Sequence, residues 1–233
     1  MLSSFDITKK WPATNPEAIQ LYSLPTPNGV KVSAMLEETG VTYEAHRVDF
    51  SKNDQTSPEF LSLNPNNKIP AIIDPNGPGG APLGLWETGA ILIYLAEKTG
   101  LFLPADPAAR LETIQWLMWQ MGGAGPMFGQ LGFFYRMGGK DIEDKRPLER
   151  YVGESKRLLS VLDGRLEGRT FIMGDEYTIA DIAVWPWVGV LDTFYGAGEI
   201  LDLPSYSNVT RWLDTAKARP ASEAAQKIPA APE

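Results

Sequence analysis

The sequence predicts an α/β domain with the element order βαβαββα, followed by an all-helical domain. Three observations predict this fold class. Over about the first hundred residues, strand-like and helix-like segments alternate, with proline and glycine at their ends. After a proline-containing stretch at residues 101–107, strand signals nearly vanish and long helix-like segments follow. A length of 233 residues with 43% hydrophobic content is enough for two modest domains with real cores.

The elements of the first domain follow one another in a regular order. Residues 19–24 alternate as a strand does, and Thr26 followed by Pro27 is typical of the start of a helix, which then ends at Gly40. The remaining segments are a strand-like run at 41–50, a short helical turn at 57–61, two short strands at 69–74 and 82–86 joined by a glycine-rich turn at 76–80, and a helix over 88–98 closed by Gly100. This order gives a four-stranded sheet with helices on its faces.

The second domain is expected to consist of long helices at about 108–137, 145–168, 178–195 and 205–219. The run Gly122 to Pro126 should kink or unwind the first of them, and Thr178 to Asp181 has the form of a capping box. The expected limits are an N-terminal extension at 1–18 that lies on the surface or is disordered, a first domain at 19–101, a linker at 102–107, a helical domain at 108–220 and a tail at 221–233. The tail is expected to end in a frayed Ala/Pro segment.

Composition excludes several classes of protein. The formal net charge of −8 disfavours a broad footprint for nucleic acid or an anionic membrane. No apolar run approaches the roughly 18 residues of a membrane span, and no secretory signal opens the chain, so we expect a cytoplasmic protein. Zero cysteines and a single histidine, His46, argue against a disulfide framework, a metal site and a protein nucleophile of the cysteine or triad kind. If sulfur chemistry occurs, the sulfur arrives with the ligand.

The first candidate site is the junction of a strand and a helix at Thr26 and Asn28. Unpaired main-chain N–H groups and the positive end of the helix dipole point toward whatever binds there. A thiol with a pKa of about 8.5 is only about 3% ionised at pH 7, and a pKa lower by about 2 units, or about 2.7 kcal/mol, makes most of it thiolate. Taken alone, the pattern is more often an ordinary helix cap.

Two further segments carry groups that suit a peptide-like ligand. Ile69 and Pro70 open a short strand, and because proline cannot donate to the ladder, the neighbouring backbone is suited to pair with an extended ligand. Lys68 beside them is positioned to meet a carboxylate, although a lone lysine is usually solvated. Thr88 at a helix start suits the carboxylate of an α-amino acid, and Glu87 before it suits the ammonium. An ordinary capped helix with a nearby acid is the simpler alternative for this pair.

Several motifs together resemble a known family: TPNG at 26–29, NPNNKIPA at 64–71, ETGAILIYLAEKTGLFLP at 87–104, QWLMWQMGGAGPMFGQ at 115–130 and DEYTIADIAVWPW at 175–187. In one order and register they closely resemble bacterial glutathione transferases of the Nu class and the related fungal nitrogen-regulator-like branch. The resemblance covers roughly residues 19 to 220. It implies a thioredoxin-like first domain, glutathione as bound co-substrate, no metal, and a homodimer.

The resemblance also implies roles for individual residues. Thr26 and Asn28 flank the glutathione sulfur, and Ile69 to Pro70 is a cis-proline turn that pairs with the cysteinyl unit. The γ-glutamyl amino and carboxylate groups are held by Glu87 and Thr88. Further implied contacts are Lys68 near the glycyl end, Gln55 in the stretch before Pro58, and Arg150, which looks toward the partner subunit's site.

Other residues are weaker candidates for catalysis or are candidates for a second-substrate pocket. Tyr22 and Ser23 lie inside the first strand, too early for the sulfur-activating residue of other classes, and His46 reads as a strand residue. After the predicted kink, aromatic and methionine side chains are candidates for an apolar pocket, namely Trp119, Met127, Phe128 and Phe134.

Three functions are compatible with the sequence, and the first of them is the leading hypothesis. The first is reduction of small disulfides by bound glutathione, with a second glutathione resolving the mixed disulfide. The second is conjugation of glutathione to an electrophilic small molecule. The third is a regulatory protein that binds glutathione or another ligand without catalysis.

Overall fold

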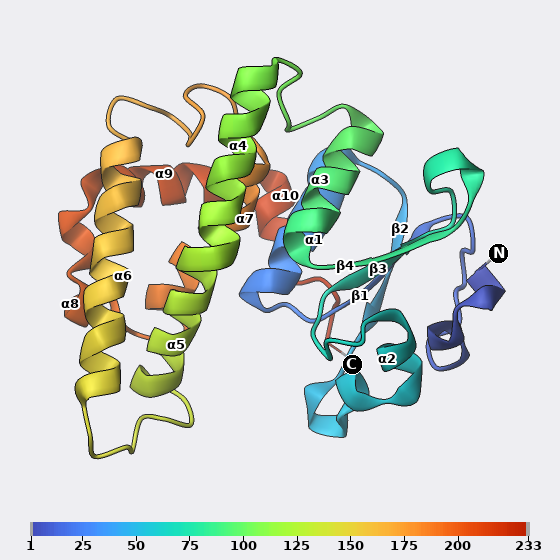
Figure 1. Ribbon diagram of the computed structural model, residues 1–233, viewed down its shortest axis with the longest axis horizontal. Helices are drawn as coiled ribbons and strands as arrows, with labels where there is room; N and C mark the ends of the chain where they lie inside the picture. The colour runs from blue at the N-terminus through green and yellow to red at the C-terminus, as the bar shows by residue number, and fades with distance from the viewer. Residues whose placement is uncertain (1, 232–233) are drawn as a thin grey trace. The chain divides into compact units, whose positions relative to one another are not determined.

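The computed structural model describes residues 2–231 and divides into two compact units. The first unit holds the chain up to Thr99 together with the segment from Pro220 onward, and the second holds Gly100–Arg219 (Figure 1). In the colours of Figure 1, the first unit therefore combines blue to green segments with the red end of the chain.

The first unit is built on a mixed four-stranded sheet in the order β2-β1-β3-β4. The strands are β1 (Ile19–Ser23), β2 (Tyr43–Arg47), β3 (Ala71–Asp74) and β4 (Leu83–Trp86). β1 runs parallel to β2 and antiparallel to β3, and β3 runs antiparallel to β4. With α1 (Pro27–Thr39), α2 (Pro58–Leu63) and α3 (Thr88–Thr99) between the strands and after them, the predicted thioredoxin-like order βαβαββα is confirmed.

The residues that the sequence analysis places at the ends of helix α1 do mark its start and its end. Thr26 caps its N-terminus by accepting a hydrogen bond from Gly29 N, and Pro27 occupies the first position, where no N–H is needed. Gly40 ends it in the left-handed conformation with φ of 65°. The buried residues of α1 pack against α3 on one face of the sheet.

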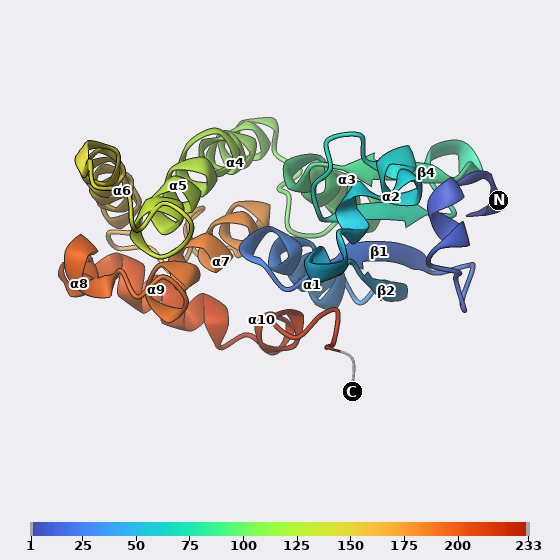
Figure 2. The ribbon, with the colours of Figure 1, turned by 90° about the horizontal axis from the view of Figure 1, so that it is seen from below.

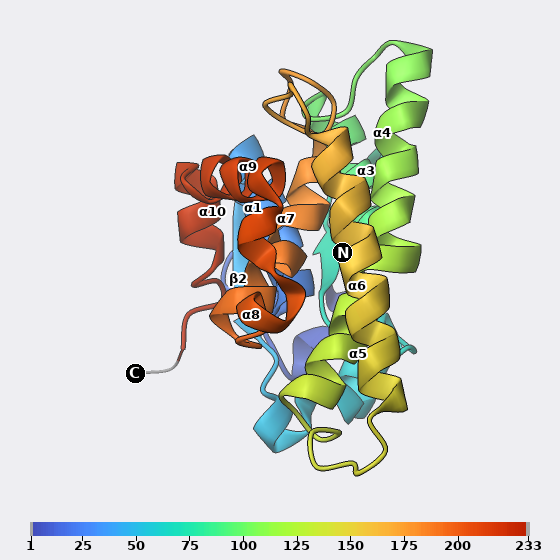
Figure 3. The ribbon, with the colours of Figure 1, turned by 90° about the vertical axis from the view of Figure 1, so that its left-hand side faces the viewer.

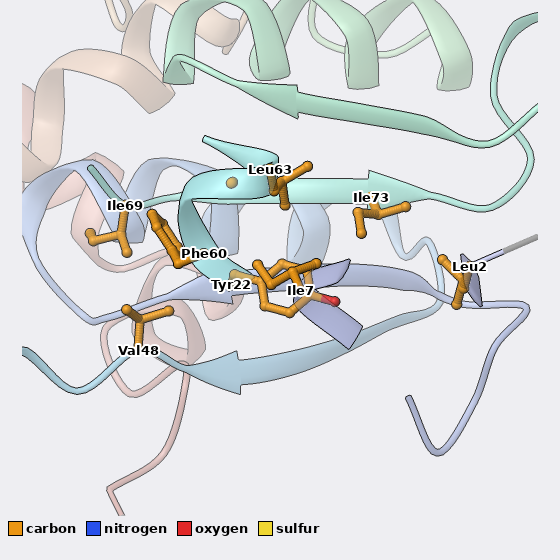
Figure 4. Packing of buried hydrophobic residues seen from close by; sticks show 9 residues of the cluster. Leu2, Ile7, Tyr22, Val48, Phe60, Leu63, Ile69 and Ile73 are labelled. Atoms are coloured by element: carbon orange, nitrogen blue, oxygen red, sulfur yellow. The ribbon is translucent and has the colours of Figure 1, made fainter. Parts of the chain in front are cut away.

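The second face of the sheet is covered by α2 and by the N-terminal segment (Figure 4). Two short 3₁₀ helices, Leu2–Ser4 and Asp6–Lys9, bring Leu2 and Ile7 against Tyr22, Phe60 and Ile73. Ile7 is fully buried, so the expectation that residues 1–18 lie on the surface or are disordered is wrong for this part. Each 3₁₀ helix contributes a single buried apolar residue, which is too few to create a periodic pattern.

The segment from Pro220 was expected to be a tail that ends in a frayed Ala/Pro stretch, of which residues 232–233 lie outside the described residues. The part of the segment before that stretch is ordered. It forms α10 (Pro220–Ala225), which packs on α1 (Figure 2) and buries Ser222 and Ala225. Farther on, Ser33 Oγ donates to Ile228 O at 3.4 Å. The small side chains of α10 allow close packing, but they carry little hydropathy for a sequence pattern to reveal.

The second unit is helical, as predicted. Its helices are α4 (Pro107–Trp119), α5 (Gly125–Tyr135), α6 (Arg146–Arg165), α7 (Ile179–Thr193), α8 (Gly198–Leu201) and α9 (Ser207–Lys217), with α4, α5 and α6 seen along their lengths in Figure 3. A π-helical turn at Gln120–Ala124 joins α4 to α5, where the sequence predicts unwinding. The capping box of Thr178 and Asp181 is confirmed. No helix within residues 2–231 is both long and apolar enough to cross a membrane.

Candidate functional site

The strand register brings the predicted motifs to one end of the sheet. Tyr22 near the end of β1 pairs with Ala71 at the start of β3, and Ala71 pairs with Trp86 at the end of β4. Ser23 pairs with Arg47 at the end of β2. The segments that follow β1, β2 and β4 and the segment that precedes β3 therefore all lie at this end. They carry the candidates Thr26, Asn28, Gln55, Lys68, Ile69, Pro70, Glu87 and Thr88.

The turn between β1 and α1 is held by a close approach at Gly29. A Cβ added to Gly29 would lie 1.9 Å from Leu24 O and 2.6 Å from Ser23 Oγ, so only glycine fits. Thr26 Oγ1 accepts from Gly29 N at 3.3 Å. The side chains of Thr26 and Asn28 are both half-buried on this first turn. The arrangement directs the N-terminal amides of α1 toward the end of the sheet, which suits a negatively charged group.

The loop from Asn64 to Pro70 is organised by a residue that the sequence analysis did not single out. Asn64 is 1% exposed; its Nδ2 donates to Lys68 O at 2.5 Å and its Oδ1 accepts from Asn66 N at 2.9 Å. The Ile69–Pro70 bond is cis, as expected. Among the residues described, the main chain of Ile69 makes no hydrogen bond, which leaves it able to pair with an extended ligand.

The third segment is the junction of β4 and α3. Glu87 adopts a left-handed backbone conformation with φ of 71°, which is uncommon for a non-glycine residue. Residues in such conformations are found preferentially at functional sites. This conformation lets α3 begin at Thr88, with Glu87 as the one residue between the strand and the helix. Glu87 is exposed and Thr88 is 4% exposed, so a carboxylate and the amides of a helix start lie side by side.

Lys31 lies behind this junction and was missed by the sequence analysis. Its side chain is 1% exposed, and its Nζ donates to Thr88 Oγ1 at 3.3 Å. Burial lowers the pKa of Lys31 to about 7, against the opposing effect of the Glu87 carboxylate. The one available signal was a lysine inside the otherwise apolar and small run from Gly29 to Leu36.

Gln55 and Arg150 lie on different units. Gln55 is half-buried in the 3₁₀ helix Asp54–Thr56, and its Oε1 is buried with no hydrogen-bond partner among the residues described. A buried amide oxygen normally has a partner, so this atom fits a ligand donor. Arg150 lies exposed on α6 of the second unit.

The four residues suggested for a second-substrate pocket do not share one environment within the second unit. Phe128 is fully buried, so it is a core residue and the suggestion is wrong for its side chain. Trp119 and Met127 are half-buried, and so is Phe134, whose ring stacks on that of Tyr151 with centroids 5.6 Å apart. A separate cavity of about 690 Å³ in this unit lies among α7, α8 and α9.

Tyr22 and His46 pack against each other in the first unit. Tyr22 is fully buried and its ring stacks on that of His46 with centroids 4.8 Å apart. His46 Nε2 lies 2.7 Å from Gln20 Oε1, and burial lowers the pKa of the imidazole. The side chain of Tyr22 belongs to the cluster under α2 (Figure 4), so its phenol lies in the core.

Comparison with known proteins gives matches over both units. Residues 17–97 match the family description "Glutathione S-transferase, N-terminal domain", and residues 147–215 match "Glutathione S-transferase, C-terminal domain". The disulfide-bond oxidoreductase YfcG of Escherichia coli is 47% identical over 205 residues, which are 88% of this chain and 92% of that protein.

Solved structures agree with these matches. A glutathione transferase of Burkholderia graminis, with two glutathione molecules bound per subunit, is 64% identical with a TM-score of 0.98, covering 100% of this chain and 97% of that one. A glutathione transferase of Pseudomonas putida, with one glutathione disulfide bound per subunit, is 61% identical with a TM-score of 0.96, covering 98% of this chain and 99% of that one.

Proposed function

We infer that this chain, which belongs to the glutathione S-transferase family, is an enzyme that reduces small disulfides with bound glutathione. The observation that carries the proposal is the strand register, which gathers Thr26, the Ile69–Pro70 backbone and the Glu87–Thr88 junction at one end of the sheet. The similar proteins support it. YfcG is a disulfide-bond oxidoreductase, and the two bacterial transferases hold two glutathiones or a glutathione disulfide.

The groups at this end of the sheet match the chemistry of glutathione. The main chain of Ile69 offers one N–H and one C=O to the cysteinyl unit, in the manner of an added strand. Glu87 suits the γ-glutamyl ammonium, and Thr88 with the first amides of α3 suits the carboxylate. Lys68 is exposed beside Ile69 and suits the glycyl carboxylate, and Gln55 Oε1 suits an amide donor.

Activation of the sulfur falls to Thr26 and Asn28. A hydroxyl donor, an amide donor and the N-terminus of α1 stabilise a thiolate more than a thiol, which lowers the thiol pKa. The chain contains no cysteine, so the nucleophilic sulfur belongs to the ligand.

The reaction has two exchange steps. The bound glutathione thiolate attacks one sulfur of the substrate disulfide, forming a mixed disulfide and releasing the other half as a thiolate, which takes a proton. A second glutathione thiolate attacks the glutathione sulfur of the mixed disulfide, giving glutathione disulfide and the second thiol. Two glutathiones are oxidised and one disulfide is reduced, so electrons balance without any metal.

We also propose the finer assignments that the family resemblance suggests. The protein is a cytoplasmic Nu-class enzyme with a small-molecule substrate, and it forms a homodimer in which Arg150 faces the partner subunit's site. With a formal net charge of −8, a nucleic acid or an anionic membrane is not expected as a partner.

Steady-state assays distinguish the three functions. We expect glutathione with 2-hydroxyethyl disulfide to give turnover well above that with a standard electrophile such as 1-chloro-2,4-dinitrobenzene. Strong conjugation without disulfide reduction would favour the second function. Binding of glutathione without turnover of either substrate would favour the regulatory one.

A further inference from the structure

Lys31 is a charged group in the core of the first unit. Lysine is almost never fully buried unless its ammonium is paired, because removing a charge from water costs several kcal/mol. The side chain is 1% exposed, and its neighbours Val30 and Val32 are buried apolar residues of α1. The ammonium is aimed at the start of α3, where its Nζ lies 3.3 Å from Thr88 Oγ1. The ammonium therefore places a buried donor group at the start of α3.

The contact fixes the orientation of the Thr88 hydroxyl. An ammonium has three donors and no acceptor, so Thr88 Oγ1 is the acceptor in this hydrogen bond. The hydroxyl proton of Thr88 then points away from Lys31. The first amides of α3 are also donors, so hydroxyl, amides and ammonium together favour an anion at this helix start.

We propose that Lys31 is a positioning residue for the ligand's α-carboxylate, acting through the hydroxyl of Thr88 while Glu87 takes the ligand's ammonium. This rests on the proposed function, in which glutathione is the ligand. Lys31 and Glu87 then divide the two charges of the γ-glutamyl end. The exposed carboxylate of Glu87 lies one residue before Thr88 and would repel the ligand's α-carboxylate. The buried ammonium of Lys31 offsets this repulsion.

The arrangement has a consequence for pH. The pKa of Lys31 is about 7, and a carboxylate bound nearby raises it, so binding takes up a proton between the two values and weakens as pH rises above about 7. Glu87 is the charged group that acts on Lys31 directly. The other charged groups on the elements around α1 are Asp74 of β3, Glu97 and Lys98 of α3, and Glu223 of α10, of which Asp74 and Lys98 pair with each other at 2.8 Å.

The main test compares glutathione with 4-aminobutyryl-cysteinyl-glycine, which lacks only the α-carboxylate. Calorimetry at pH 6.5 is carried out on the wild-type chain, on Lys31→Met and on the control Lys9→Met, an exposed lysine on the N-terminal segment. We expect wild type and control to prefer glutathione by tenfold or more, the loss typical of a charge-assisted hydrogen bond. Lys31→Met should reduce the preference to less than about threefold, with binding of the analogue unchanged.

Each other outcome has a defined meaning. If Lys31→Met weakens both ligands equally, or retains the wild-type preference, Lys31 has only a structural role and the inference is overturned. If wild type binds no glutathione, the proposed function itself fails. If circular dichroism shows Lys31→Met to be unfolded, the test uses the wild-type chain alone. The ligand is then S-methylglutathione, because it has no thiol whose proton could contribute to the measured uptake. Proton uptake at pH 7.5, from calorimetry in buffers of different ionisation enthalpy, supports the inference, and no uptake overturns it.

Discussion

Substitution of Gly29 by alanine tests whether the turn between β1 and α1 holds the site. The added Cβ would lie 1.9 Å from Leu24 O, more than 1 Å inside normal contact, and that oxygen also accepts from Thr26 N at 2.7 Å. Because a main-chain oxygen cannot swing aside, we place the strain at the top of the overpacking range, about 3 kcal/mol. Alanine regains at most about 1 kcal/mol of helix propensity, which leaves a net loss of about 2 kcal/mol.

The assay is thermal unfolding followed by circular dichroism, with disulfide turnover measured on the folded variant. For a chain of this size, about 2 kcal/mol corresponds to a fall in Tm of roughly 4 to 8 °C. The same substitution at Gly153, a helical glycine of α6 with nothing within 4 Å of its added Cβ, should leave Tm unchanged or raise it. Turnover of Gly29→Ala should fall because Thr26 moves with Leu24. A Tm within 2 °C of wild type together with unchanged kcat/KM would refute the reasoning.

The remaining predictions concern single side chains in both units. Thr26→Ala should lower kcat roughly tenfold or more while the glutathione Kd changes less than threefold, and Thr26→Ser should restore kcat; equal losses in both would remove Thr26 as the sulfur donor. Burial alone would raise the pKa of Asp74, but the hydrogen bond from Lys98 holds it below its usual range, so this carboxylate stabilises the fold above about pH 4 and less below it. Asp74→Asn should therefore lower Tm at pH 7, and the difference from wild type should shrink in melts below pH 4. Asp181 is fully buried and accepts from Trp212 Nε1 at 2.9 Å and from two main-chain amides, so Asp181→Ala should cost about 3 kcal/mol or more in urea unfolding, with a loss below 1 kcal/mol contradicting its structural role.

Much of the fold was predictable because its signals are local. Thr26 and Pro27 mark the start of α1, Gly40 marks its end, and the capping box at Thr178 marks the start of α7. The N-terminal segment was not predictable, because its 3₁₀ helices are too short for a period. Its burial depends on the face of the sheet that α2 leaves open, which is a tertiary property.

Candidate site residues were predictable from the sequence where residue type and spacing indicate their chemistry. They were not predictable where their role depends on how deeply the side chain is buried. Glu87 and Thr88 stand out because an acid and a helix start occur together, although the left-handed conformation of Glu87 has no marker in the sequence. A helical lysine normally lies in water, so the apolar and small residues around Lys31 were the one sign of its burial. Aromatic residues occur both in cores and in ligand pockets, so the sequence could not distinguish these two locations for Phe128. Its burial in the structure assigns it to the core.

The location of Tyr22 supports the proposal that the sulfur is activated at a helix start. Tyr22 is in β1, on the face where it packs with Ile7, Phe60 and Trp11, and burial raises the pKa of its phenol. A buried phenol stays protonated and is held by its packing, so its hydroxyl cannot serve a thiolate at the end of the strand. Thr26 is where β1 ends and α1 begins, so its hydroxyl and the amides of α1 are already oriented before a ligand arrives. In the proposed mechanism these donors stabilise the thiolate, and packing at Gly29 holds them in place. The site and the fold should therefore respond together when that packing is disturbed.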